Sequence, residues 1–103
     1  MVCAVSIMIH IYYTGHGNAA REFAQEMVSS GLAEAVRAEE GCLGYEYFFP
    51  MGSSQTVLLV DCWRDQTAID LHHKSPMMDR IAQLRKKYRL HMRVERYLPE
   101  NPS

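Results

Sequence analysis

The sequence predicts an α+β domain in which one four-stranded antiparallel sheet carries helices on one face. Three observations indicate this class. Strand-like and helix-like segments follow the order β-α-β-β-α-β, the two middle strands are joined by a short turn, and 103 residues are close to the commonest size of a single domain. This order is the split βαβ, or ferredoxin-like, arrangement. We assign residues 1–98 to the domain and residues 99–103 to a polar tail.

The first predicted element is a strand over residues 2–13, which are rich in β-branched and aromatic side chains. Side chains alternate across a strand, so the odd-numbered residues make a fully apolar face and the even-numbered ones make a mixed face. The mixed face carries His10 and Tyr12. We expect the apolar face to be dry core and the mixed face to be the one that lines a cavity.

The second element is a helix over residues 19–40, where apolar residues recur at three- and four-residue spacing. Asn18 is a good N-cap residue for this helix. Gly31 lies inside the pattern, where glycine is tolerated at a cost of about 1 kcal/mol. Gly41 ends the helix, as glycine commonly does after a C-cap.

The second half of the chain has clear start signals for its helices. Asp65 caps a short helix, and Ser75 followed by Pro76 marks the start of another. The elements predicted after the first helix are two strands joined as a hairpin, the short helix, the longer helix and a last strand, over residues 42–50, 55–64, 66–74, 76–87 and 88–98.

Two adjacent histidines lie near the end of the short helix. Each helical residue turns about 100°, so His72 and His73 cannot share one face or chelate one ion. The apolar residues of this helix place His72 towards the sheet and His73 towards solvent. The last turn of a helix favours a protonated imidazole through the helix dipole.

Charge and cysteine content exclude several classes of protein. The net charge of −1, from 11 basic and 12 acidic residues, lacks the excess of positive charge that binding to nucleic acid or to an acidic membrane requires. No apolar run reaches transmembrane length, and the first residues do not read as a signal peptide. Three scattered cysteines have no zinc spacing and indicate reduced core thiols in a cytoplasmic protein. We predict no metal site.

The predicted helices can cover only one face of the sheet, yet the first strand is apolar on one face and partly apolar on the other. An exposed apolar sheet face indicates a partner, and a domain this small gains by pairing. We therefore expect a homodimer in which two copies place their sheets face to face.

Two stretches, "EEGCLGYEYF" and "TVLLVDCWRDQTAIDLHHKSP", resemble the antibiotic biosynthesis monooxygenase family of the dimeric α+β barrel superfamily. The residues that carry the resemblance are Glu39, Gly41, Cys42, Tyr45, Asp61, Trp63, Asp65, Ala68, His72, Ser75 and Pro76. The match spans about residues 39–76. It implies a dimeric barrel with a cavity inside each subunit, between sheet and helices.

The resemblance also implies an activity. Family members include cofactor-independent monooxygenases that oxidise quinols or polycyclic phenols with dioxygen, and the same reaction on a small quinol-like or phenolic substrate is the leading expectation here. No cofactor is then needed, because the substrate supplies the electrons. Two alternatives stay open, since a fold does not fix a function. One is an isomerase or tautomerase that moves protons on a small carbonyl substrate in the same pocket. The other is a non-catalytic protein that binds a small molecule.

Such a site needs a base, aromatic walls and a few hydrogen-bond donors. The candidates are His72 and His10 as proton handlers, Trp63 and Tyr45 as walls, Tyr12 and Tyr47 as donors, and Met77 as part of an adaptable apolar pocket.

Each candidate also has a structural alternative. His72 is then a buried, hydrogen-bonded histidine, Trp63 and Tyr45 are core, and the two remaining tyrosines are dimer-face aromatics. Met77 stands where other family members carry a second histidine, which weakens a mechanism with two histidines. Asp61 either orients a histidine or pairs with an arginine of the last strand, and we favour the pairing.

Overall fold

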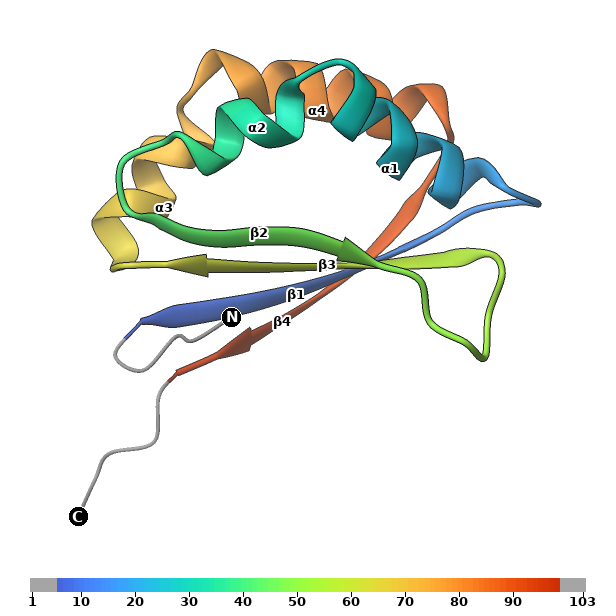
Figure 1. The fold of residues 1–103 in the computed structure, drawn as a ribbon, viewed down its shortest axis with the longest axis horizontal. Coiled ribbons are helices and arrows are strands. Elements are labelled where there is room, and N and C mark those ends of the chain that lie inside the picture. The colour runs from blue at the N-terminus through green and yellow to red at the C-terminus, as the bar shows by residue number, and fades with distance from the viewer. Residues whose placement is uncertain (1–5, 99–103) are drawn as a thin grey trace.

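The computed structural model describes residues 6–98, which form one layer of strands and one layer of helices (Figure 1). The elements are β1 (Ile7–Thr14), α1 (Ala19–Ser29), α2 (Leu32–Arg37), β2 (Cys42–Phe48), β3 (Thr56–Trp63), α3 (Gln66–His73), α4 (Pro76–Lys87) and β4 (His91–Tyr97). All four helices lie on one side of the sheet (Figure 1). The predicted α+β, ferredoxin-like class is confirmed. The proposed tail, residues 99–103, lies outside the described residues.

The sheet has the strand order β2-β3-β1-β4, and every neighbouring pair is antiparallel. Residue Ile9 of β1 pairs with Asp61 of β3 on one side and with Arg96 of β4 on the other. Residues directly opposite one another in a sheet point to the same face. These three side chains therefore form one row across the helix-covered face.

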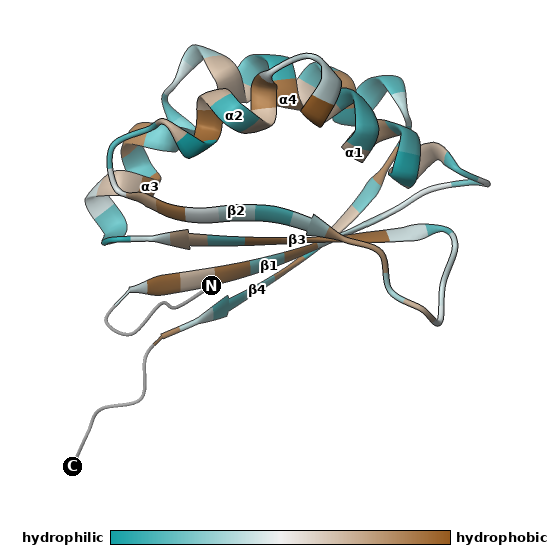
Figure 2. Ribbon diagram, in the orientation of Figure 1, coloured by the Kyte–Doolittle hydropathy of each residue, from teal (hydrophilic) through white to brown (hydrophobic). Residues whose placement is uncertain are grey.

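The core fills the space between this face and the helices. Tyr13, Trp63, Phe23, Met27 and Ile69 are buried there, each with at most 3 % of its surface exposed. Brown, apolar positions alternate with teal, polar ones along the helices, as expected for helices with one buried side (Figure 2).

The single helix predicted over residues 19–40 is wrong, because the chain breaks at Gly31. This glycine has φ +84°, a left-handed conformation that a helix interior does not hold and that glycine adopts without strain. The hydroxyl oxygen of Ser30 accepts a hydrogen bond from the backbone N–H of Leu32 across the break. Two shorter helices, α1 and α2, result.

The other boundaries of helices and strands differ from the predicted ones by at most a few residues. The last strand begins at His91 rather than at residue 88, because Arg89 has φ +54° and turns the chain after α4. The predicted start of the first strand at residue 2 lies outside the described residues. Asn18 makes no side-chain cap bond, whereas the carboxylate of Asp65 accepts from the backbone N–H of Ala68 as predicted.

The cysteines depart from the prediction of three reduced thiols. Cys42 is a free, half-buried thiol, but Cys62 is disulfide-bonded. The thiol argument for a cytoplasmic location therefore does not hold at Cys62. Within residues 6–98, no helix is long and apolar enough to cross a membrane.

Candidate functional site

A cavity of about 370 Å³ lies between the helix-covered face of the sheet and helices α3 and α4. Its volume is within the range of small-molecule sites, about 300–1,000 Å³. Most of its wall is apolar, including Ile9 and Ile11 of β1. Met92 and Val94 of β4 also line it and are 46 % and 52 % exposed, so the cavity opens along β4.

His72 lies in the last turn of α3, and its ring lines the cavity. Only 6 % of the residue is exposed, which confirms the predicted inward orientation. Its Nδ1 lies 2.6 Å from Oε2 of Glu39, in the loop before β2. Among the described residues, nothing hydrogen-bonds its other ring nitrogen, Nε2.

The charge state of His72 follows from two opposed effects. Burial lowers the pKa of its imidazole, and the neighbouring Glu39 carboxylate raises it; the net pKa lies below the usual value. Burial thus outweighs the helix dipole that was expected to favour the protonated form. At neutral pH the ring is neutral, its Nδ1–H donates to Glu39, and Nε2 keeps a free lone pair.

Trp63 joins His72 to Asp61. Its ring stacks on the imidazole of His72, with centroids 4.6 Å apart and planes 29° apart. Its Nε1–H donates a hydrogen bond of 2.8 Å to Oδ2 of Asp61. Since Trp63 itself is only 1 % exposed, it holds both neighbours in fixed positions at one end of the cavity.

Asp61 is a buried carboxylate that faces the cavity. It is 4 % exposed, and its Oδ1 has no hydrogen-bond partner among the described residues. Burial raises its pKa to about 6, against the smaller opposite effects of the Trp63 hydrogen bond and of the backbone N–H of Asp61 itself. The predicted ion pair with an arginine of the last strand is absent from residues 6–98, where the register places Arg96 two strands away, beyond Ile9.

Tyr45 of β2 forms part of the cavity wall and is 3 % exposed. Its hydroxyl lies 3.1 Å from that of Tyr47, within hydrogen-bond distance. Burial raises the pKa of both phenols, so they stay neutral. Tyr47 supports Tyr45 from behind and is not among the residues that line the cavity.

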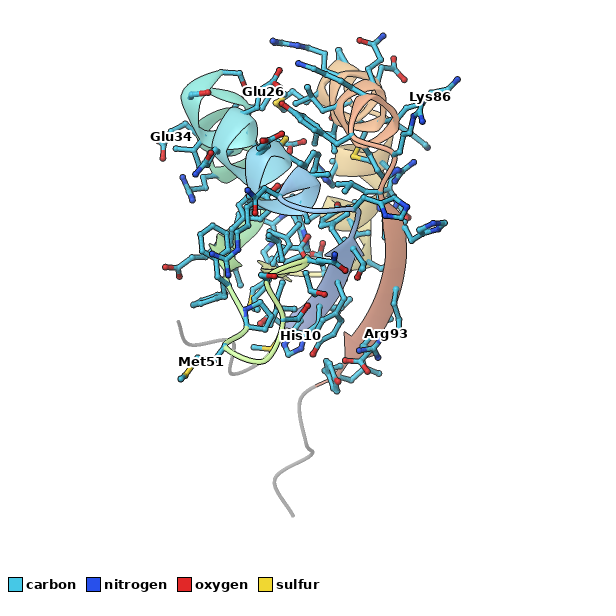
Figure 3. The ribbon with its side chains drawn as sticks, turned by 90° about the vertical axis from the view of Figure 1, so that its right-hand side faces the viewer. His10, Glu26, Glu34, Met51, Lys86 and Arg93 are labelled. Atoms are coloured by element: carbon cyan, nitrogen blue, oxygen red, sulfur yellow. The ribbon has the colours of Figure 1, made fainter. Side chains whose placement is uncertain are left out.

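The prediction that the mixed face of the first strand lines the cavity is wrong. Ile9, Ile11 and Tyr13 of the apolar face line it instead. His10 lies on the opposite side of the sheet, where its ring is 4.8 Å from that of Tyr97. Figure 3 shows His10 and Arg93 on the side of the sheet away from the helices.

Two more candidates lie elsewhere. The ring of Tyr12 is covered by the guanidinium of Arg93, 4.2 Å from the ring centroid, on the same outer face as His10. Met77 packs against the core, while its neighbour Met78 lines the cavity. The structure therefore brings together His72, Trp63 and Tyr45, but not His10, Tyr12, Tyr47 or Met77.

Several residues in or next to the cavity have no place in the site predicted from the sequence. Glu39 belongs to the family motif, and in the structure it holds His72 from 33 positions away. Arg85 and Arg96 line the cavity and have no carboxylate partner among the described residues. Across residues 6–98, no three His, Cys, Asp or Glu side chains gather as a metal site would need.

The chain matches a family of known proteins. The model of the family described as "Antibiotic biosynthesis monooxygenase" matches residues 6–84. No curated protein matches the chain.

Several solved structures share the fold. A conserved protein of Methanosarcina mazei is 18 % identical with a TM-score of 0.81, covering 95 % of this chain and 96 % of its own. A Deinococcus radiodurans protein classed with the antibiotic biosynthesis monooxygenases is 19 % identical with a TM-score of 0.80, and the match covers 94 % of this chain and 95 % of that protein. SnoaB of Streptomyces nogalater, a cofactor-independent oxygenase, is 12 % identical with a TM-score of 0.77, and the match covers 96 % of this chain and 97 % of SnoaB.

Proposed function

The chain belongs to the antibiotic biosynthesis monooxygenase family, and from this premise we propose that it oxidises a small quinol-like or phenolic compound with dioxygen and without a cofactor. The observation that carries the proposal is a mainly apolar cavity lined by His72, whose Nε2 makes no hydrogen bond among the described residues. The description of SnoaB as a cofactor-independent oxygenase supports the same reaction class.

The proposed reaction draws its electrons from the substrate. For an anthrone-like phenol the balance is R₂CH₂ + O₂ → R₂C=O + H₂O. A base removes one proton, and the resulting anion gives one electron to dioxygen. The two radicals combine into a peroxide anion, which takes the proton back from the base and becomes the hydroperoxide R₂CH–OOH. Loss of the second C–H proton and cleavage of the O–O bond then give the carbonyl and water.

His72 is the proposed base. A neutral imidazole with a free Nε2 can take the substrate proton, and Glu39 at Nδ1 stabilises the imidazolium that forms. Trp63 and Tyr45 are the proposed aromatic walls that hold the ring of the substrate. The apolar wall excludes water from the reactive anion.

We also propose that a second copy covers the outer face of the sheet. Phe48 and Tyr97 are 43 % and 44 % exposed there, beside Tyr12 and His10. Pairing would bury these aromatic rings, as a small domain requires. Sedimentation is expected to give about twice 11.9 kDa. A monomer at micromolar concentration would refute the pairing.

Oxygen uptake tests the activity. Purified protein is given a panel of hydroquinols in an oxygen electrode, and binding of the same panel is followed by thermal shift. We expect protein-dependent uptake that His72→Gln abolishes. His73 also lines the cavity but is exposed to solvent, and His73→Gln should leave uptake near normal. Binding without any uptake would end the monooxygenase proposal. Turnover of a carbonyl compound without oxygen would then favour an isomerase, and binding alone a non-catalytic protein.

A further inference from the structure

We propose that Oδ1 of Asp61 accepts a hydrogen bond from a hydroxyl group of the ligand, so that the cavity selects phenols or enols with a free O–H over their ethers. This inference rests on the proposed function only in placing a small hydroxylated ligand in the cavity. It assigns the choice of ligand to Asp61 and leaves the removal of a proton to His72.

The state of the Asp61 carboxylate is the first observation. Oδ2 is fixed by the Nε1–H of Trp63 at 2.8 Å, while Oδ1 is buried and has no partner within residues 6–98. Buried carboxylate oxygens are almost always hydrogen-bonded, because burial without a partner is costly. Asp61 lines the cavity, so a ligand there can supply the missing donor.

Among the described residues, no donor forms a hydrogen bond with Oδ1. The titratable and charged groups that line the cavity with Asp61 come from every element packed against it: Tyr13, Tyr45, His72, His73, Arg85 and Arg96. Of these, His72 already uses its Nδ1 in the hydrogen bond with Glu39. Arg96 lies two strands away from Asp61, and it forms no ion pair with any carboxylate of the described residues.

The arrangement around Trp63 makes the inference specific. The indole ring stacks on His72 and its N–H bonds to Asp61, so two acceptors, Nε2 of His72 and Oδ1 of Asp61, flank one rigid aromatic residue. Both residues line a cavity whose walls are mainly apolar. A planar ring with a hydroxyl group satisfies Asp61, whereas the matching methyl ether has no hydrogen to donate.

The pH dependence follows from the same geometry. Since Oδ2 already accepts from Trp63, a proton added to Asp61 resides on Oδ1 and turns that atom from an acceptor into a donor. The pKa of Asp61 is raised to about 6 by burial, so the preference for the hydroxyl compound should fade below about pH 6.

The test compares 1-naphthol with 1-methoxynaphthalene by titration calorimetry under nitrogen, so that no oxidation intervenes. At pH 7.5 the wild-type protein should bind the naphthol roughly tenfold or more tightly than the ether, as expected for a hydrogen bond to a charged group. Asp61→Asn should bind the two compounds equally, because its amide presents a donor to either oxygen. Asp65→Asn, which changes an exposed carboxylate at the α3 cap, should behave as wild type.

Two results would overturn the proposal. One is wild-type protein that fails to bind the naphthol or fails to discriminate it from the ether. The other is Asp61→Asn protein that keeps the wild-type preference. A purely structural Asp61 predicts loss of thermal stability in Asp61→Asn, whereas a ligand acceptor predicts a melting temperature equal to or above wild type. Because binding is measured without oxygen, a failed uptake assay does not decide this result.

Discussion

Replacing Asp61 by Asn should stabilise the protein at neutral pH and lose that advantage in acid. The wild-type carboxylate is buried, with one oxygen unpaired among the described residues, so its ionised form is disfavoured in the folded state. Asparagine has nearly the same shape, carries no charge and can still accept the N–H of Trp63. The substitution therefore removes the penalty and keeps the packing.

The magnitude follows from the pKa of Asp61. Burial raises it from 3.8 to about 6 in the folded protein. A folded pKa above the unfolded value means that the protonated group favours folding below about pH 3.8. That contribution is lost as the pH rises through about 6. A difference of roughly 2 pH units corresponds to about 3 kcal/mol of unfolding free energy. The advantage of the variant should grow by about this amount from pH 3.5 to pH 7.5.

The assay is urea unfolding at pH 3.5, 5 and 7.5, followed by the fluorescence of Trp63, the only tryptophan of the chain. Wild type and variant are compared at equal protein concentration, since a dimer makes stability depend on concentration. Asp65→Asn controls for the general loss of a carboxylate. A stability difference that does not change with pH would refute the buried, ionised state of Asp61, as would a variant less stable than wild type at pH 7.5.

Two other substitutions test the supports of the site. Glu39→Gln should lower the pKa of His72 further and cost about 1–3 kcal/mol of stability, because Nδ1 loses a charged acceptor; an unchanged imidazole titration by NMR would contradict this. Gly41→Ala should cost more than about 2 kcal/mol, since its φ is +83° and an added Cβ would lie 2.5 Å from that of Ala68. Gly31→Ala, with φ +84° and open space around it, should cost only about 1–2 kcal/mol by urea unfolding, and equal losses would argue against the close approach at Gly41.

The fold was predictable because its signals are local. Asp65 and the pair Ser75–Pro76 mark helix starts within a few residues, and they mark them correctly. The break at Gly31 is harder to predict, because the apolar spacing of a helix continues on both sides of this glycine. The segment Ser29-Ser30-Gly31 has the glycine of a helix end, which holds the left-handed backbone that the structure shows.

The site was only partly predictable, because its contacts are not local. The turn angle of a helix placed His72 towards the sheet, and the structure agrees. Its partner Glu39 is 33 residues away, and no periodicity connects the two. The lack of an arginine partner for Asp61 depends on strand register, which sets Arg96 beyond Ile9. Register is fixed by the packing of the whole sheet.

A last prediction concerns His10, the second candidate proton handler, and follows from the two faces of β1. The helices were expected to pack the apolar face fully, but Ile9 and Ile11 remain half-buried and line the cavity. His10 lies on the opposite face, against Tyr97, so the sheet itself separates it from the cavity.

His10→Gln should therefore leave naphthol binding and oxygen uptake within about twofold of wild type, while His72→Gln removes uptake. Calorimetry and the oxygen electrode measure the two quantities on the same preparations. A His10→Gln protein that stays dimeric but loses turnover would contradict the placement of the site on the helix-covered face, because the sheet lies between His10 and the cavity of its own subunit. Loss of both dimer and turnover would instead show that the site depends on the paired state.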